Sequence, residues 1–149
     1  MKSLTSVISL YNKNFHHKDE FKKVIWGSEK SMRNRHKLFF KLLKKKNYDR
    51  WLDIGSGTGI IFQSNELNKI NIKNIHSLEV NENLCNLIKE KKIQKNLKII
   101  NNDIMKYKTN LKFNLISVIG VLQNSGYFYD IIIKKIISLM NTNCELFIT

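Results

Sequence analysis

Three glycines at alternate positions, Gly55, Gly57 and Gly59, follow a short apolar run of the chain. Glycines at the turn between a strand and a helix let the chain turn tightly, let the backbone approach a ligand, and let the next helix pack on the strand. An ordinary turn would explain one such glycine, or two. The three glycines, with Ser56 between the first two, therefore predict a ligand-binding loop.

The residues around these glycines narrow the class of ligand. A dinucleotide-binding loop needs Gly or Ala at position 60, which is Ile60, and a P-loop needs a G-K-[ST] sequence that does not follow here. Asp53 ends the buried run, where a carboxylate is costly to bury alone and needs a cationic or N–H partner. Such a carboxylate would repel a pyrophosphate and would suit a ligand that carries an ammonium group.

Two further acidic residues follow the next two apolar runs. Glu79 comes twenty residues after Gly59 (79 − 59 = 20), and at this spacing its carboxylate can accept hydrogen bonds from both hydroxyls of a ribose. Asp103 could accept from an adenine amino group while the backbone N–H of Ile104 meets a ring nitrogen. The alternatives are a surface glutamate and a solvated aspartate in a turn. The spacing favours ribose binding by Glu79.

The segments that position these residues alternate between strand and helix patterns. We predict strands over 51–54, 75–80, 97–100, 113–119 and 144–149, and helices over 60–67, 83–91 and 129–140. This alternation predicts a three-layer, Rossmann-like α/β fold with a mostly parallel open sheet. Ligands bind at the carboxyl ends of such strands, where the polar residues above lie.

Residues 1–46 precede this pattern and read as helical and basic. Their apolar positions, including Phe39 and Phe40, alternate with lysines. We expect an N-terminal helical cap over 1–46 and a ligand-binding core over 47–149, within a single domain.

In order, these residues resemble the motif series of class I S-adenosylmethionine-dependent methyltransferases. The resemblance covers about 49–149 and rests on Asp53, Gly55-x-Gly57-x-Gly59, Glu79, Asp103-Ile104, and the run from Phe113 through Ile119 to Gln123. It implies S-adenosyl-L-methionine as the cofactor, with the glycine loop against the methionine portion and Asp53 near the amino group. It also implies that Glu79 holds the ribose, that Asp103 contacts adenine, and that Ile119 belongs to the cofactor site. Asn114 departs from the family, which often has Asp there.

An upstream segment resembles one found ahead of the glycine loop in some bacterial members of this class. It reads Trp26-Gly27-Ser28-x-x-Ser31-x-x-x-Arg35. The resemblance implies that Trp26 and Arg35 help to close the cofactor pocket. The alternative is a tryptophan of the core and a solvated arginine.

The class of methyl acceptor is limited mainly by the motifs that the chain lacks. Methyltransferases that act on exocyclic base nitrogens typically carry Asn/Asp-Pro-Pro-Tyr/Phe after the fourth strand, whereas this chain has Leu122-Gln123-Asn124-Ser125 there and contains no proline. Neither Cys85 nor Cys144 is placed as a nucleophile of the cytosine-methylating type. The stretch Gly120-Val121-Leu122-Gln123 resembles O-, N- or C-methyltransferases of small molecules. We therefore expect a small-molecule acceptor; an RNA methyltransferase and a non-catalytic cofactor-binding remnant are the alternatives.

No catalytic base can be assigned from the sequence. Tyr11, His16 and His17 lie in the segment that often caps the acceptor site in this family, although each also fits a surface position. We expect structural roles for His36 and His76.

The high positive charge would suit a nucleic-acid partner, but the composition as a whole does not favour one. The formal net charge is +14 at pH 7, but the only arginines are Arg33, Arg35 and Arg50. Arginine is preferred for bidentate phosphate and base contacts, and abundant Lys, Asn and Ile are also what an A/T-rich coding sequence imposes. No apolar run approaches the roughly 18 residues of a membrane span. The two isolated cysteines indicate a reduced, cytoplasmic protein without a metal site.

The sequence ends at Thr149, inside the predicted fifth strand. In the family the sheet normally continues with a helix and an antiparallel hairpin. We therefore expect a fragment without this hairpin, with an uncovered sheet edge, weakened cofactor binding and an incomplete substrate pocket.

Overall fold

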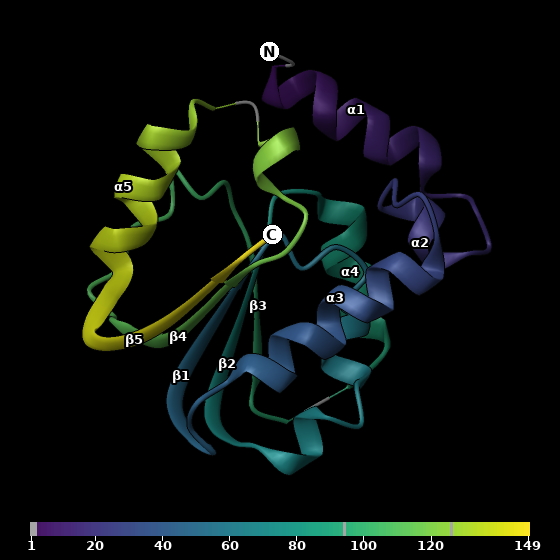
Figure 1. Cartoon of the computed structure of the whole chain (residues 1–149). Helices are drawn as coiled ribbons and strands as arrows, with labels where there is room; N and C mark the ends of the chain where they lie inside the picture. Colours follow the sequence, from purple (N-terminus) through teal and green to yellow (C-terminus); the bar gives the residue numbers. More distant parts are fainter. Residues whose placement is uncertain (1–2, 94, 126) are drawn as a thin grey trace.

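One parallel sheet organises the chain, whose computed structural model describes residues 3–93, 95–125 and 127–149. Its strands are β1 (Asn47–Ile54), β2 (Asn71–Glu79), β3 (Leu97–Asn101), β4 (Phe113–Val118) and β5 (Met140–Ile148). They lie in the order β3-β2-β1-β4-β5, and every pairing is parallel (Figure 1). The predicted Rossmann-like sheet is confirmed. The strand order reverses between β1 and β4, so a crevice forms at their carboxyl ends.

Within the described residues, the helices α1 (Leu4–Asn14), α2 (Glu20–Lys23) and α3 (Glu29–Leu42) precede the sheet. Ser3 and Ser28 cap α1 and α3, because their hydroxyls accept hydrogen bonds from the first-turn N–H groups of Ser6 and Ser31. Figure 1 shows α1 and α2 beyond the carboxyl end of the sheet and α3 along one of its faces.

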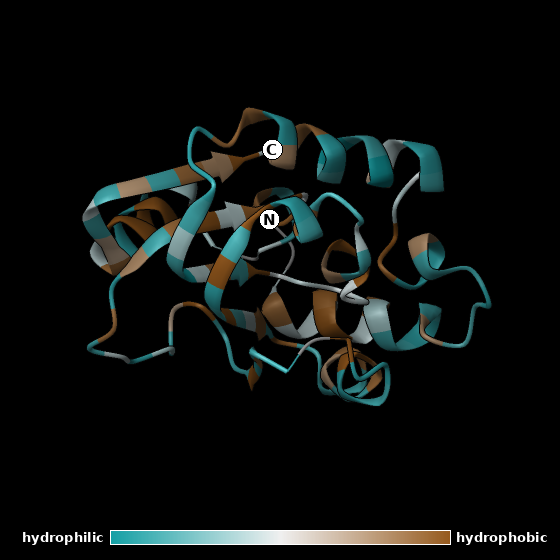
Figure 2. Cartoon of the chain, turned by 90° about the horizontal axis from the view of Figure 1, so that it is seen from below, coloured by the Kyte–Doolittle hydropathy of each residue, from teal (hydrophilic) through white to brown (hydrophobic). Residues whose placement is uncertain are grey.

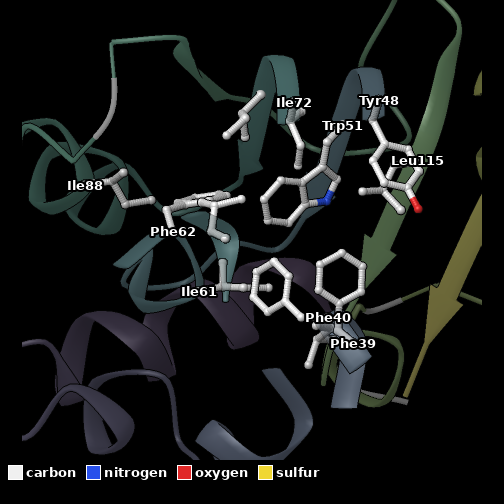
Figure 3. Close-up of a cluster of buried hydrophobic side chains, with 12 residues drawn as sticks. Phe39, Phe40, Tyr48, Trp51, Ile61, Phe62, Ile72, Ile88 and Leu115 are labelled. Carbon is white, nitrogen blue, oxygen red and sulfur yellow. The ribbon is translucent and has the colours of Figure 1, made fainter. Parts of the chain in front are cut away.

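The face of the sheet under α3 carries an aromatic core. Phe39 of α3 stacks on Trp51 of β1 with ring centroids 5.3 Å apart, and Phe62 meets the same indole edge-on at 5.3 Å (Figure 3). Helix α4 (Glu82–Glu90) adds Ile88 to this core. Aromatic pairs in these geometries add stabilisation beyond the area that they bury. This core fixes α3 on β1.

The opposite face is covered by α5 (Tyr129–Leu139). Ile132 and Ile136 of α5 are fully buried in a second apolar cluster with Leu52 of β1 and Ile116 of β4. Burial on both faces explains why β1 and β4 read as continuous apolar runs. Figure 2 shows hydrophobic residues recurring along the strands, while the helices are banded by hydrophobic and hydrophilic residues.

The α-helix predicted over 60–67 is wrong. The chain instead forms two short 3-10 turns, η1 (Ile60–Gln63) and η2 (Leu67–Lys69). Ile60, Ile61 and Phe62 are all buried in succession, which a tight turn permits and the single apolar stripe of an amphipathic helix does not. The other predicted helices match α4 and α5 closely, and β1, β2 and β5 begin a few residues earlier than expected.

A search of the described residues for membrane-crossing helices finds none of sufficient length and apolarity.

Candidate active site

A cavity that is partly open to solvent lies at the carboxyl ends of β1, β2 and β4. The wall combines the glycine loop, the ends of the strands, the loop after β4, and side chains of α1 and α3. Of the predicted site residues, the structure brings eight to this wall: Trp26, Gly55, Ser56, Gly57, Glu79, Asp103, Ile104 and Ile119.

The glycine loop forms the wall through its backbone. Gly55, Gly57 and Gly59 have φ angles of +72°, +56° and +72°, a region that other residues rarely adopt. A β-carbon on Gly57 would lie 2.8 Å from Cγ1 of Val24, so the N-terminal segment crosses the loop closely. Gly59 does not line the cavity; a β-carbon there would lie 2.9 Å from Cγ1 of Ile88 in α4. Gly59 therefore serves helix packing.

Glu79 ends β2 with only 4% of its surface exposed. Its Oε2 accepts a hydrogen bond from the Gly57 N–H at 2.9 Å, and its Oε1 accepts from the Asn81 N–H at 2.8 Å. Burial raises the pKa of this carboxyl to about 7, although the backbone N–H donors favour the ionised form. Each oxygen keeps a second lone pair, so the carboxylate can still accept from hydroxyl groups of a ligand.

Asp103 lies just beyond β3, and one of its oxygens is already engaged by the loop after β4. Its Oδ1 accepts from the Met105 N–H at 3.0 Å, and its Oδ2 accepts from the hydroxyl of Tyr127. This hydrogen bond raises the pKa of Tyr127 to about 12. The carboxylate of Asp103, which is predicted to accept from an adenine amino group, therefore already accepts a hydrogen bond from Tyr127.

Asp53 lies beneath the glycine loop and does not line the cavity. It is 3% exposed, and the parallel register places it opposite Ser117 of β4, whose hydroxyl donates to its Oδ1. Ser117 in turn accepts from Nε1 of Trp51 at 2.8 Å. Among the described residues, the side-chain partner of Asp53 is this hydroxyl and not the predicted cationic or N–H group. Burial raises the pKa of Asp53 to about 6.

Trp26 and Arg35 meet, but only Trp26 reaches the cavity. A β-carbon on Gly120, whose φ is +70°, would lie 2.7 Å from Cζ2 of Trp26. The guanidinium carbon of Arg35 lies 4.8 Å from the centroid of the indole, a cation–π distance. The prediction that both residues close the pocket is corrected for Arg35, which supports the tryptophan instead.

Three polar residues of the cavity were not among the predicted cofactor residues. Tyr11 of α1, His36 of α3 and Asn124 of the loop after β4 bring polar atoms to the wall, whereas His16, His17 and His76 do not line it. Burial raises the pKa of Tyr11 to about 12 and lowers that of His36 to about 4, so both are uncharged at neutral pH. The spacing of Met32 and His36, four residues apart on one helix face, is the signal that could have placed His36 beside the site.

Comparison with known proteins decides the family. The family model described as ribosomal RNA adenine dimethylase matches residues 37–141. The chain belongs to the ribosomal RNA adenine dimethylase family. It is thus a class I methyltransferase, and S-adenosyl-L-methionine is its cofactor, as the motif series implied. A search of curated proteins finds no significant match.

Solved structures share the fold of this family member at low sequence identity. The N-methyltransferase NodS from Bradyrhizobium japonicum WM9, in complex with S-adenosyl-L-homocysteine, has a TM-score of 0.74 and 16% identity over 95% of this chain and 71% of its own. The DhpI complex with SAH has a TM-score of 0.69 and 10% identity over 97% and 67%. The ribosomal protein L11 methylase from Lactobacillus delbrueckii subsp. bulgaricus has a TM-score of 0.64 and 15% identity over 89% and 72%.

The residues of the cavity fit this cofactor. The glycine turns leave backbone where a β-carbon would collide with Val24 or Val121, Glu79 offers carboxylate lone pairs, and Ile104 and Ile119 are apolar walls. When bound, S-adenosylmethionine supplies an electrophilic methyl group on a sulfonium sulfur. The task of the chain is to orient the acceptor and exclude water.

Proposed function

We propose that this methyltransferase acts on a small molecule that is neutral or cationic. The chain has 26 Lys and Arg residues, yet none of the described residues that line the cavity is a Lys or an Arg. The acidic side chains there are Glu79 and Asp103. An anionic acceptor, or an RNA strand bound through its phosphates, is expected to contact Lys or Arg side chains at the cavity. The charge of the lining is the observation that carries this proposal.

We assign the predicted cofactor residues by their place in the site. Gly55, Ser56 and Gly57 take the methionine portion, and Glu79 takes the ribose hydroxyls. Asp103, Ile104 and Ile119 take the adenine. Three predicted residues act on the cofactor indirectly. Asp53 supports the glycine loop from beneath, Gly59 allows α4 to pack closely, and Arg35 positions Trp26. Residues 1–46 form a cap on a core that spans 47–149.

The acceptor lies on the side of the cavity made by α1, α3 and the loop after β4. Tyr11 is protonated at neutral pH and can donate a hydrogen bond, whereas the neutral imidazole of His36 can accept one. Together with the side chain of Asn124, these groups suit an acceptor whose nucleophile is an amine or a hydroxyl. The alignment of that nucleophile supplies much of the rate of an in-line displacement.

RNA is the second candidate acceptor. The family match and the net charge of +14 support it. Against it stands the segment Leu122–Ser125 after β4, which lacks the proline-rich motif typical of enzymes that methylate exocyclic base nitrogens.

A methyl-transfer experiment separates the two candidates. The protein is incubated with S-adenosylmethionine carrying a tritiated methyl group and with cell extract divided into small-molecule, RNA and protein fractions. We expect label in the small-molecule fraction for wild type and for Glu66→Gln, which alters only an exposed ion pair with Lys69. Glu79→Gln should abolish this labelling. Label that enters RNA with the same dependence on Glu79 would replace our proposal with the second candidate.

A further inference from the structure

The short helix α2 is held over the glycine loop, although none of its side chains is fully buried. Hydrophobic burial, to which the partly buried Phe21 contributes, is therefore only part of what holds it there. The rest comes from the polar contacts of Glu20, from the hydrogen bond that Nζ of Lys23 donates to the Phe15 carbonyl oxygen at 2.6 Å, and from the packing of residues 24–26.

The polar contacts form one closed set between three elements. Lys91, at the carboxyl end of α4, places Nζ 2.5 Å from Oε1 of Glu20 and donates to the Thr58 carbonyl oxygen at 2.8 Å. The hydroxyl of Thr58 donates to Oε2 of Glu20 at 2.9 Å. The ion pair is largely shielded, with side-chain exposures of 13% for Lys91 and 30% for Glu20. Because Thr58 lies between Gly57 and Gly59, the set ties α2 directly to the glycine loop.

The residues after α2 lie across two glycine turns. Val24 contacts Gly57 and Trp26 contacts Gly120, so the segment 20–26 spans the ends of β1 and β4. Between them Ile25 has a φ of +59°, which is strained for a β-branched residue. The strain lets Val24 and Trp26 both face the cavity wall while Ile25 stays exposed.

Helix α1 has a separate attachment. Oδ1 of Asn12 accepts from the side-chain amides of Asn81 at 2.8 Å and Asn83 at 3.2 Å. The loss of the Lys91–Glu20 pair should therefore free the segment 20–26 without releasing the end of α1.

We propose that Glu20 and Lys91 are positioning residues for methyl transfer. Joined through Thr58, they hold the segment 20–26 over the glycine loop, slow the release of the cofactor product, and keep Trp26 as a wall of the acceptor side. This proposal rests on the assignment of the cavity to S-adenosylmethionine. Neither residue needs to touch the cofactor, because each acts through Thr58, Val24 and Trp26.

The test compares paired variants of the whole chain. Glu20→Gln and Lys91→Met each remove one charge of the pair, and Glu66→Gln and Lys69→Met make the same changes in an exposed ion pair elsewhere. The dissociation rate of S-adenosylhomocysteine is measured by stopped flow, at a temperature where every variant is folded. We expect about a tenfold faster release for Glu20→Gln and Lys91→Met, and less than a twofold change for the controls.

A second measurement needs no ligand. Trypsin cleavage at Lys22 and Lys23 should be several-fold faster in Lys91→Met than in Lys69→Met, because the segment 20–26 detaches more often. The reversed pair Glu20→Lys with Lys91→Glu should restore part of the slow release; its cleavage is not compared, because Glu20→Lys adds a trypsin site beside Lys22. Wild-type release and cleavage rates in Lys91→Met would overturn the role of the pair. The assignment of the cavity would instead be overturned if the wild-type chain bound no S-adenosylhomocysteine while trypsin still cleaved Lys91→Met faster than Lys69→Met.

Discussion

The contact between Gly120 and Trp26 gives a quantitative prediction for Gly120→Ala. Gly120 has a φ of +70°, and placing an L-residue in this left-handed region costs about 1–2 kcal/mol. The new methyl group would also lie 2.7 Å from Cζ2 of Trp26, so the indole must move and weaken its contact with Arg35, worth about 0.5–1 kcal/mol. We expect unfolding to become easier by about 2 kcal/mol, which lowers the Tm by about 4–8 °C for a domain of this size.

Gly27 supplies the matched control, one residue after Trp26. A β-carbon on Gly27 meets no atom within 4 Å, and its φ is ordinary. Gly27→Ala should therefore change the unfolding free energy by less than about 0.5 kcal/mol. Both variants are compared by urea unfolding and by calorimetry with S-adenosylhomocysteine, whose affinity should fall only in Gly120→Ala. Equal stability of the two alanine variants would refute the reasoning from the turn and from Trp26.

Three further predictions concern single side chains. Burial raises the pKa of Glu79 from 4.5 to about 7, so the folded carboxyl still holds its proton at a pH where the unfolded one has lost it. The wild-type protein therefore loses stability as the pH rises from about 4.5 to 7, and the unfolding free energy of Glu79→Gln should increase relative to that of wild type. A difference in urea unfolding that does not change with pH would contradict this. Ile25→Asn should stabilise the ligand-free chain by about 1 kcal/mol in thermal melts, because Asn tolerates a positive φ; a lower Tm would show that Ile25 is not strained. Tyr127→Phe removes the donor that occupies Oδ2 of Asp103 and should tighten S-adenosylhomocysteine binding several-fold by calorimetry, whereas weaker binding would mean that Tyr127 orients Asp103 for the ligand.

The sheet could be predicted from the sequence because each strand is a short apolar run that ends in turn residues or in an acidic residue. The glycine loop and Glu79 follow β1 and β2, and their placement at one edge is a consequence of parallel pairing. The turn after Gly59 could not be predicted, because the sequence does not show that Ile60, Ile61 and Phe62 are all buried. Only their simultaneous burial against α3 and α4 selects the 3-10 geometry.

The sequence by itself determined the fold class, the carboxyl-end crevice and the order of the cofactor motifs. These features depend on local patterns, namely apolar periodicity, positive-φ glycines and carboxylates at strand ends. The tertiary structure decided which predicted residues reach the cavity, because that depends on register and on contacts between distant segments. Asp53 pairs with Ser117 across β1 and β4 and is withdrawn beneath the loop, whereas His36 comes to the wall from a helix with no motif of its own. The ion pair between Lys91 and Glu20 joins positions that lie 71 residues apart in the sequence, a separation that no local pattern can predict.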